Sequence, residues 1–158
     1  MLGAIVGDIV GSRFEFENTN STDFELFTDE STFTDDTVCT IAIADALLKN
    51  GGKDFQTLLM GWCRRYPGRG YGGRFYNWFI NRTQEPYNSF GNGSAMRVSP
   101  VAWFGSSIKE VLQLAEQSAA ITHNHPEGIK GAKAIAHAIC LARTGCDKDT
   151  IKKEIATS

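Results

Sequence analysis

The sequence is short of positive charge, of long apolar runs and of paired cysteines, and each shortage excludes a class of protein. Sixteen lysines and arginines stand against eighteen aspartates and glutamates, so we expect no basic surface for nucleic acid or anionic lipid. The apolar N-terminal stretch MLGAIVGDIVG is short, contains Asp8 and has no basic residues before it. It therefore predicts neither a signal peptide nor a membrane span.

The four cysteines, Cys39, Cys63, Cys140 and Cys146, form no CxxC pair and have no Cys/His spacing that is typical of zinc sites. We expect them to be buried free thiols in a reducing compartment, which predicts a cytoplasmic protein. A chain of 158 residues can bury a hydrophobic core without disulfides, so residues 1–158 are expected to form one domain.

Sustained alternation of apolar and polar residues is also missing, as are repeats and low-complexity segments. Apolar residues recur instead at helical spacing, which predicts an all-α protein. The expected helices cover residues 2–11, residues 35–49, the segment from Phe55 to before Pro67, a short segment around Trp78, the proline-interrupted SAMRVSPVAWF, and three segments that begin near Ser107, Pro126 and Asp147. Residues 12–33 have no period and are predicted to form a long functional or mobile loop.

Two finer features of these helices can be predicted. In residues 2–11, apolar residues fall at i, i+3, i+4 and i+7, which predicts a buried helix. Glycines recur there at every fourth residue, which would let another backbone approach closely. Ser107 and Glu110 have the spacing of a capping box at the start of their helix.

The stretch FTDDT places Thr34, Asp35 and Asp36 at the start of an expected helix. Threonine or aspartate there can cap the free amides, and acids are favoured by the helix dipole. A cap needs one such residue, however, and neighbouring acids repel unless a cation lies between them. Oxygen ligands suit Mg²⁺ or Mn²⁺, and Asp8 and Glu15 could add further oxygens. The spacing alone leaves both interpretations open.

Two further stretches contain candidate ligand-binding residues. SFGNGSAMR, residues 89–97, places glycines around Asn92 just before a helix, which suits either phosphate binding or a plain capped turn. ITHNHPE holds His123 and His125, whose spacing is poor for two zinc ligands on one helix. One of them could touch a ligand, although solvated histidines in loops are the commoner case.

Four stretches together resemble the ADP-ribosylglycohydrolase family, which includes the enzyme that reactivates dinitrogenase reductase. They are GAIVGDIVGSRFE, FTDDTVCTIAIADALL, YNSFGNGSAMRVSPVAW and THNHPEGIKGAKAIAHAI, and they occur in the family's order. The resemblance implies a compact, orthogonal all-α bundle with two Mg²⁺ ions in a cleft. It also implies hydrolysis of the N- or O-glycosidic bond that links ADP-ribose to a protein side chain or related acceptor.

The resemblance also implies roles for individual residues. Thr34, Asp35 and Asp36 match the family's first three metal ligands, and the two aspartates could relay a proton. Glu15 matches a glutamate on the flexible loop after the first helix and is the first choice for a base or a gate. The residues that match the ADP-ribose site are Ser89, Phe90, Gly91, Asn92, Gly93 and His123. His125 matches no family role.

Family members are markedly longer, and their remaining metal ligands lie in a later Asp-x-Asp-Thr stretch. This chain has those letters at residues 147–150, but the helix that follows is charged, so we interpret Asp147 as a helix cap. The fold would then be incomplete at its C-terminus and hold only half of the metal cage. One Mg²⁺ or none is then expected, with Mn²⁺ as a substitute.

Three alternatives to an intact enzyme follow from that departure: a non-catalytic ADP-ribose-binding protein, a crystallin-like structural remnant, or one half of a split enzyme. Retention of the FTDDT and GNGS stretches favours the hydrolase. The expected partners are ADP-ribose or an ADP-ribosylated protein, and neither a membrane nor nucleic acid. Apolar faces of the second and seventh helices are expected to be exposed, which predicts self-association or a complementing C-terminal half.

Overall fold

The computed structural model describes residues 1–156, and within that range the chain forms helices and no strand. The predicted all-α class is therefore confirmed. The helices are α1 (Leu2–Gly11), η1 (Ser12–Phe14, a 3-10 turn), α2 (Asp35–Asn50), α3 (Phe55–Arg65), α4 (Gly73–Ile80), α5 (Gly93–Met96), α6 (Ser99–Phe104), α7 (Ile108–Ala120), α8 (Pro126–Arg143) and α9 (Lys148–Ala156).

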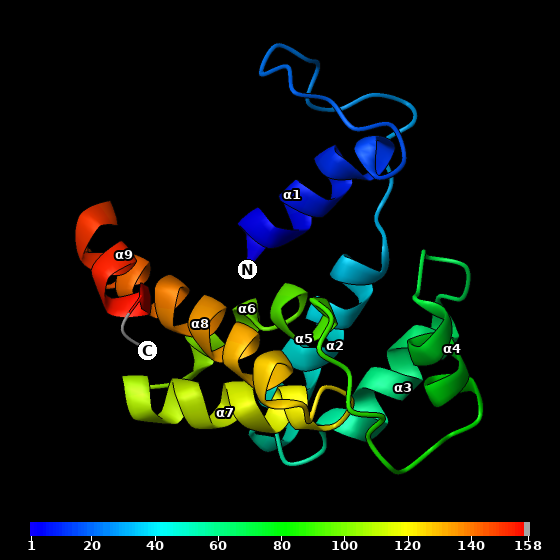
Figure 1. The fold of residues 1–158 in the computed structure, drawn as a ribbon. Helices are drawn as coiled ribbons and strands as arrows, with labels where there is room; N and C mark the ends of the chain where they lie inside the picture. The colour runs from blue at the N-terminus through cyan, green and yellow to red at the C-terminus, as the bar shows by residue number, and fades with distance from the viewer. Residues whose placement is uncertain (157–158) are drawn as a thin grey trace.

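Helix α2 lies at the centre of the fold and contributes to both hydrophobic clusters (Figure 1). One of its faces packs with α6, α7 and α8, where Ile43 and Val101 are fully buried. Another face packs with α3 and α4, where Cys39, Leu59 and Phe79 are fully buried. Because α2 is packed on two faces, the position of its first turn, and of the side chains in that turn, is well fixed.

The predicted helix boundaries are largely confirmed. Pro126 occupies the first turn of α8, and the proline-interrupted segment divides into α5 and α6. Ser107 caps α7, since its hydroxyl accepts from the Glu110 amide at 3.2 Å. The second half of the predicted capping box is wrong, because the Glu110 carboxylate accepts instead from the amide and hydroxyl of Ser106.

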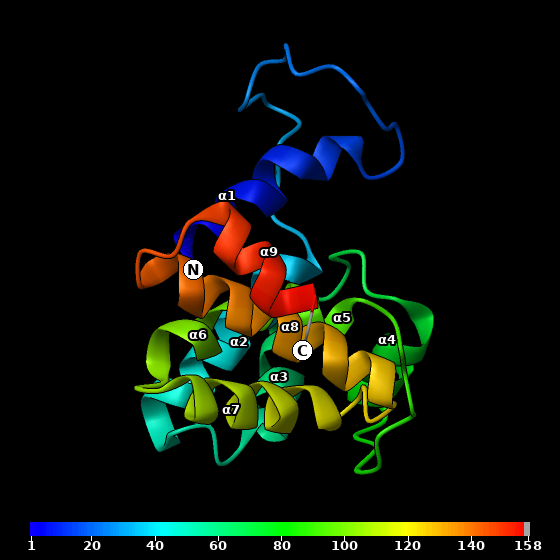
Figure 2. The ribbon, with the colours of Figure 1, turned by 60° about the vertical axis from the view of Figure 1, so that its left-hand side comes forward.

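The prediction that α1 is buried is wrong. None of its residues is buried, and Leu2 and Val6 are 75% and 46% exposed. Figures 1 and 2 show α1 and the loop after it standing away from the helices that form the core. The predicted close approach of another backbone is also not seen, because a Cβ added at Gly3, Gly7 or Gly11 would meet nothing within 4 Å.

The seventh predicted helix, which begins at Pro126, is α8 in the structure, and the predicted exposure of α2 and α8 is only partly right. Each of these helices exposes one large apolar residue, Leu48 in α2 and Ile135 in α8, while α6 exposes Trp103 and Phe104. Three of the cysteines are buried as predicted, and Cys146 is only half-buried; all four are free thiols. No helix within residues 1–156 is long and apolar enough to cross a bilayer.

Candidate active site

The start of α2 is tied to α1 through Asp8. Its carboxylate accepts hydrogen bonds from the amide and hydroxyl of Thr34, at 2.9 and 2.5 Å, and from those of Thr37, at 3.2 and 2.5 Å. The Thr34 hydroxyl also accepts from the Asp36 amide at 3.4 Å, so Thr34 is the N-cap of α2. The capping interpretation of FTDDT is thus confirmed for Thr34, and the carboxylates of Asp35 and Asp36 are not needed for it.

Asp35 and Asp36 are neighbours in the first turn of α2, yet their side chains line two different cavities. Consecutive helical residues point about 100° apart, which explains the divergence. Asp35 lines a cavity of about 340 Å³, here called the loop cavity, which also contains residues of the Ser89–Gly93 loop. Asp36 lines a cavity of about 650 Å³, here called the acidic cavity, between α1 and α2.

The acidic cavity gathers carboxylates that are far apart in the sequence. Asp8, Glu15 and Asp36 line it together with Thr34, so four of the five predicted oxygen donors of this region line one cavity, and Asp35 lines the other. The loop cavity is close by, since Asn92 and Met96 line both cavities. The Asp35 and Glu15 carboxylates both lie within 4 Å of the position that a Cβ on Gly70 would take.

Burial and the neighbouring acids raise the pKa of the two aspartates at the start of α2. Burial, together with the charges of Asp36, Glu15 and Asp8, raises the pKa of Asp35 to about 6. Burial likewise raises the pKa of Asp36, with Asp8 and Glu15 contributing. No lysine or arginine forms an ion pair with either aspartate among residues 1–156. Four acids near one another without a cationic side chain are the setting in which a bound cation would lower the electrostatic energy.

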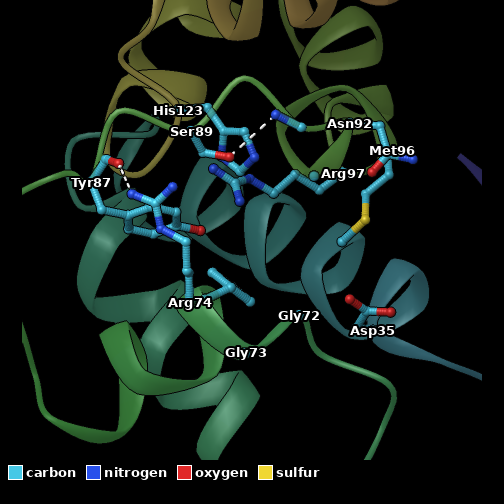
Figure 3. Close-up of a pocket in the computed structure, with 13 residues that line it drawn as sticks. Asp35, Gly72, Gly73, Arg74, Tyr87, Ser89, Asn92, Met96, Arg97 and His123 are labelled. Atoms are coloured by element: carbon cyan, nitrogen blue, oxygen red, sulfur yellow. Dashed lines mark hydrogen bonds between the residues drawn. The ribbon is translucent and has the colours of Figure 1, made fainter.

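The Ser89–Gly93 loop is hydrogen-bonded to the segment that connects α7 to α8. The Ser89 amide donates to the Thr122 carbonyl at 3.3 Å, and the Gly91 amide donates to the Ser89 hydroxyl at 3.2 Å. A Cβ on Gly93 would lie 3.1 Å from the His123 ring, so the glycine allows the loop to approach that ring. Figure 3 shows Ser89, Asn92 and His123 at one end of the loop cavity and Asp35 at the other.

Of the predicted site residues, the structure places Ser89, Gly91, Asn92, Gly93 and His123 in the lining of the loop cavity. Phe90 is the exception among the loop residues. It is 71% exposed, is not part of that lining, and has a ring contact with His125, whose centroid lies 5.4 Å away.

Several lining residues of the loop cavity were not predicted from the sequence, and three of them have polar or charged side chains: Arg74, Tyr87 and Arg97. Arg97 is 1% exposed, and it sits in an otherwise apolar stretch, SAMRVSPVAWF, where a buried charge is unusual enough to have been a signal. Arg74 and Tyr87 gave no such signal, because α4 and the segment before the loop meet only in the folded chain. Arg74 donates to the Tyr87 carbonyl at 2.6 Å (Figure 3).

His125 and Asp147 have structural contacts that account for them. The His125 ring accepts from the Glu127 amide at 3.1 Å and caps α8. Asp147 accepts from the Thr150 amide at 2.7 Å, and this bond lowers the pKa of Asp147. The predicted capping role of Asp147 is therefore confirmed.

The donors around Asp35 and Asp36 fit Mg²⁺ in kind but form only part of a coordination shell. Among residues 1–156, no three His, Cys, Asp or Glu side chains come together as a metal-binding group. Mg²⁺ in proteins is commonly held by one or two carboxylates, with waters and substrate phosphates completing the octahedron. Asp35 and Asp36 lack a cationic partner and each lines one of two neighbouring cavities, which is compatible with that mode of binding.

The chain matches the family model described as ADP-ribosylglycohydrolase over residues 1–157. It is similar to the mouse protein named ADP-ribosylhydrolase ARH3, with 30% identity over 92% of this chain and 48% of the mouse protein. The human protein of that name is 29% identical, over 92% of this chain and 49% of its own length. A Pseudomonas putida protein named ADP-ribosylarginine hydrolase Tri1 is 27% identical, over 94% of this chain and 47% of its own length. The chain thus spans about half the length of the curated relatives it matches.

Proposed function

Because this chain belongs to the ADP-ribosylglycohydrolase family, we propose that it provides the ADP-ribose site and part of the metal site of a hydrolase. The reaction would cleave the N- or O-glycosidic bond between ADP-ribose and a protein side chain or related acceptor. One observation carries the proposal: Asp35, the Ser89–Gly93 loop and His123 come from distant parts of the sequence and line one cavity.

The loop end of the cavity suits the diphosphate and ribose of ADP-ribose. Loop amides, the Ser89 and Asn92 side chains and the His123 ring can all face a ligand there, and glycines let the backbone approach it closely. The buried guanidinium of Arg97 also lines this cavity, so its positive charge favours an anionic ligand. The acidic cavity lies next to this loop. In our proposal the loop binds the ligand, and the acidic residues carry out proton transfer.

The acidic end suits hydrolysis at the anomeric carbon. Cleavage there develops positive oxocarbenium character, which nearby carboxylates stabilise, and a water must lose a proton. In our proposal Glu15 is the base or gate, and Asp35, with a pKa of about 6, can exchange a proton near neutral pH. Thr34, Asp35 and Asp36 would hold Mg²⁺, or Mn²⁺ in its place. When bound, such an ion would supply Lewis-acid chemistry that lowers the pKa of a water and helps to orient the sugar diol.

The decisive experiment measures ADP-ribose release and ADP-ribose binding on the same protein. The chain is incubated with ADP-ribosylated protein, with Mg²⁺ or with chelator, and released ADP-ribose is quantified. Release that depends on Mg²⁺ supports the hydrolase. If ADP-ribose neither is released nor binds at millimolar concentration, the proposal is wrong.

A matched pair of variants tests the metal part. Asp35→Asn with Asp36→Asn should abolish binding of Mg²⁺ or Mn²⁺ by calorimetry and leave helical content nearly unchanged, because Thr34 supplies the cap. Asp149→Asn removes one charge from the first turn of α9, where the side chain is exposed, and should leave metal binding intact. If the double variant binds the ions as the parent does, these residues are not the metal ligands.

A second candidate function is ADP-ribose binding without catalysis. The observation that favours it is the lack of a three-acid metal group among residues 1–156. It predicts measurable ADP-ribose binding that does not change with Mg²⁺, and no release from any ADP-ribosylated protein. The two candidates therefore differ in both readouts of the same experiment.

A further inference from the structure

Arg97 is buried at 1% exposure and has no carboxylate partner within residues 1–156. Its Nη2 donates to the Ser118 carbonyl and to the Thr122 hydroxyl, both at 2.9 Å, and its Nε has no hydrogen-bond partner. A buried cation that is not paired with an acid costs stability, which directs attention to the contacts that Arg97 does make. One of those contacts leads to the loop cavity.

Thr122 is fully buried and lies between Arg97 and His123. Arginine is always protonated, so the Thr122 oxygen must accept the hydrogen bond from Arg97. The only other partner of that hydroxyl among residues 1–156 is His123 Nδ1, at 2.7 Å. A buried hydroxyl proton without an acceptor is costly, so the hydroxyl donates to Nδ1.

A ring that accepts at Nδ1 carries its proton at Nε2 when it is neutral. Nε2 is the atom that faces the loop, since a Cβ on Gly93 would lie 3.2 Å from it and one on Gly91 would lie 3.9 Å from it. The ring is 4% exposed, and the Tyr87 ring lies beside it with centroids 6.1 Å apart. The ring therefore has little freedom to turn over.

We propose that Arg97 and Thr122 are positioning residues that fix His123 in one orientation and one tautomer, as a neutral Nε2–H donor to an acceptor oxygen bound in the Ser89–Gly93 loop. That the oxygen belongs to the phosphate or ribose of ADP-ribose rests on the function proposed above. The tautomer itself does not depend on it.

The charge of Arg97 works in the same direction as the hydrogen bonds. A second proton on the ring would sit at Nδ1, where it would displace the Thr122 hydroxyl proton and approach the guanidinium. Burial, together with the Arg97 charge, lowers the pKa of His123 to about 4, so the ring stays neutral over the physiological range. The site offers a donor without adding a second positive charge.

The tautomer is tested directly by nitrogen NMR of the protein labelled at histidine, without any ligand. His123 is assigned by the signal lost in His123→Gln. At neutral pH we expect a pyridine-like Nδ1 and a pyrrole-like, protonated Nε2, unchanged in Thr122→Ser, which keeps the hydroxyl. A protonated Nδ1 in the parent protein would overturn the proposal, whether or not the protein binds ADP-ribose.

A double-mutant cycle tests the positioning role with ADP-ribose as the probe. Thr122→Val keeps the shape of the side chain but removes the hydroxyl, and should weaken binding about tenfold, while Thr122→Ser restores it. In a His123→Gln background, Thr122→Val should have no further effect, because the imidazole that it orients is gone. Equal losses in both backgrounds would mean that Thr122 acts only through general stability, and the positioning role would be wrong.

The two experiments separate this inference from the proposed function. If the expected tautomer is seen but ADP-ribose does not bind, the proposed ligand is wrong and the fixed donor stands. If ADP-ribose binds and Nδ1 is protonated, the site stands and the role of Arg97 and Thr122 is wrong.

Discussion

The carboxyl group of Asp35 is half-buried beside three other acids, and its pKa of about 6 compares with 3.8 in an unfolded chain. The folded state therefore holds the proton more tightly, and the sign of the pH dependence follows. Below about pH 4 the group is protonated in both states. Between about pH 4 and about pH 6 only the unfolded chain loses the proton, so stability falls as pH rises, and above about pH 6 the whole loss is present.

We therefore expect Asp35→Asn to unfold at the same temperature as the parent protein near pH 4 and at a higher temperature at pH 7, in the presence of chelator. With solvent screening the difference is about 1 kcal/mol, or about 2–4 °C in Tm. Thermal unfolding followed by circular dichroism across that pH range measures it. Adding Mg²⁺ should stabilise the parent protein and not the variant. If Tm depends on pH in the same way in the two proteins, burial and the neighbouring acids do not destabilise the ionised form of Asp35.

For single residues, the sequence predicts which residue types matter better than what each one does. The FTDDT stretch predicts a cap or metal ligands at Thr34, Asp35 and Asp36. In the structure Thr34 is the cap, so both carboxylates remain available. The contact of Asp8 with Thr37 could not be predicted, because it joins residues of two helices. The charge of Arg97 in its largely apolar stretch was a signal in the sequence, but its partners could not be predicted, because they come from α7 and the segment after it.

Helix α8 supports the loop through one glycine at its start. A Cβ on Gly128 would lie 2.7 Å from the Ser89 carbonyl oxygen and 3.0 Å from His123 Cβ, whereas one on Gly131 would meet nothing within 4 Å. The two glycines thus form a matched pair in one helix, with the same gain of about 1 kcal/mol in helix propensity on substitution by alanine.

Gly131→Ala should raise the free energy of unfolding by up to about 1 kcal/mol. Gly128→Ala should lower it by about 1–3 kcal/mol, because the clash is with backbone and the loop has to move. Urea unfolding of both variants measures the difference, and Gly128→Ala should also weaken ADP-ribose binding. Equal stabilisation by the two substitutions would show that the loop does not rest on α8 in this way.

Helix α1 depends on the carboxylate of Asp8 for its attachment, since no residue of α1 is buried. Hydrogen bonds to a charged group contribute about 1.5–3 kcal/mol each when partly shielded, so the four that Asp8 accepts are the main local constraint. Asp8→Ala should speed amide exchange in residues 2–11 by at least about tenfold.

Hydrogen exchange followed by mass spectrometry measures that effect peptide by peptide. Exchange in α8 should be unchanged, and Glu17→Ala, which removes an exposed acid from the loop that follows, is the control. If Asp8→Ala leaves exchange in α1 unchanged, contacts other than those of Asp8 hold the helix.

Most elements could be predicted because their start and stop signals are local. Ser107 and Asp147 each cap a helix through a hydrogen bond to an amide three residues later, and Pro126 occupies the first turn of α8. Gly51 ends α2 with a φ of +66°. The degree of burial could not be predicted in the same way. The apolar spacing of α1 shows that one face is apolar, but whether anything covers that face is decided by distant parts of the chain.

At the scale of the whole molecule, several exposed apolar side chains from α1, α2 and α6 lie on one surface. Met1, Leu48, Trp103 and Phe104 line a shallow cavity of about 260 Å³ where the start of α1 meets α2 and α6. Leu48 is 81% exposed and Trp103 is 55% exposed, and the apolar face of α1 continues from Met1 through Leu2. Contiguous apolar surface of this kind is typical of an interface rather than of a free surface.

We expect a second copy of the chain to cover this surface, so that the protein self-associates as its concentration rises. Leu48→Gln should weaken that association because it places a polar group where the apolar contact is most exposed, and glutamine is a good helix former, so the fold of α2 is preserved. Leu26→Gln is the control, since Leu26 is 57% exposed but lies in the loop after α1. Sedimentation velocity over a concentration series separates the outcomes: association lost only in Leu48→Gln supports this interface. A parent protein that stays monomeric throughout would show that this surface does not pair with itself. Loss of association in both variants would show that the association is non-specific and does not depend on this surface.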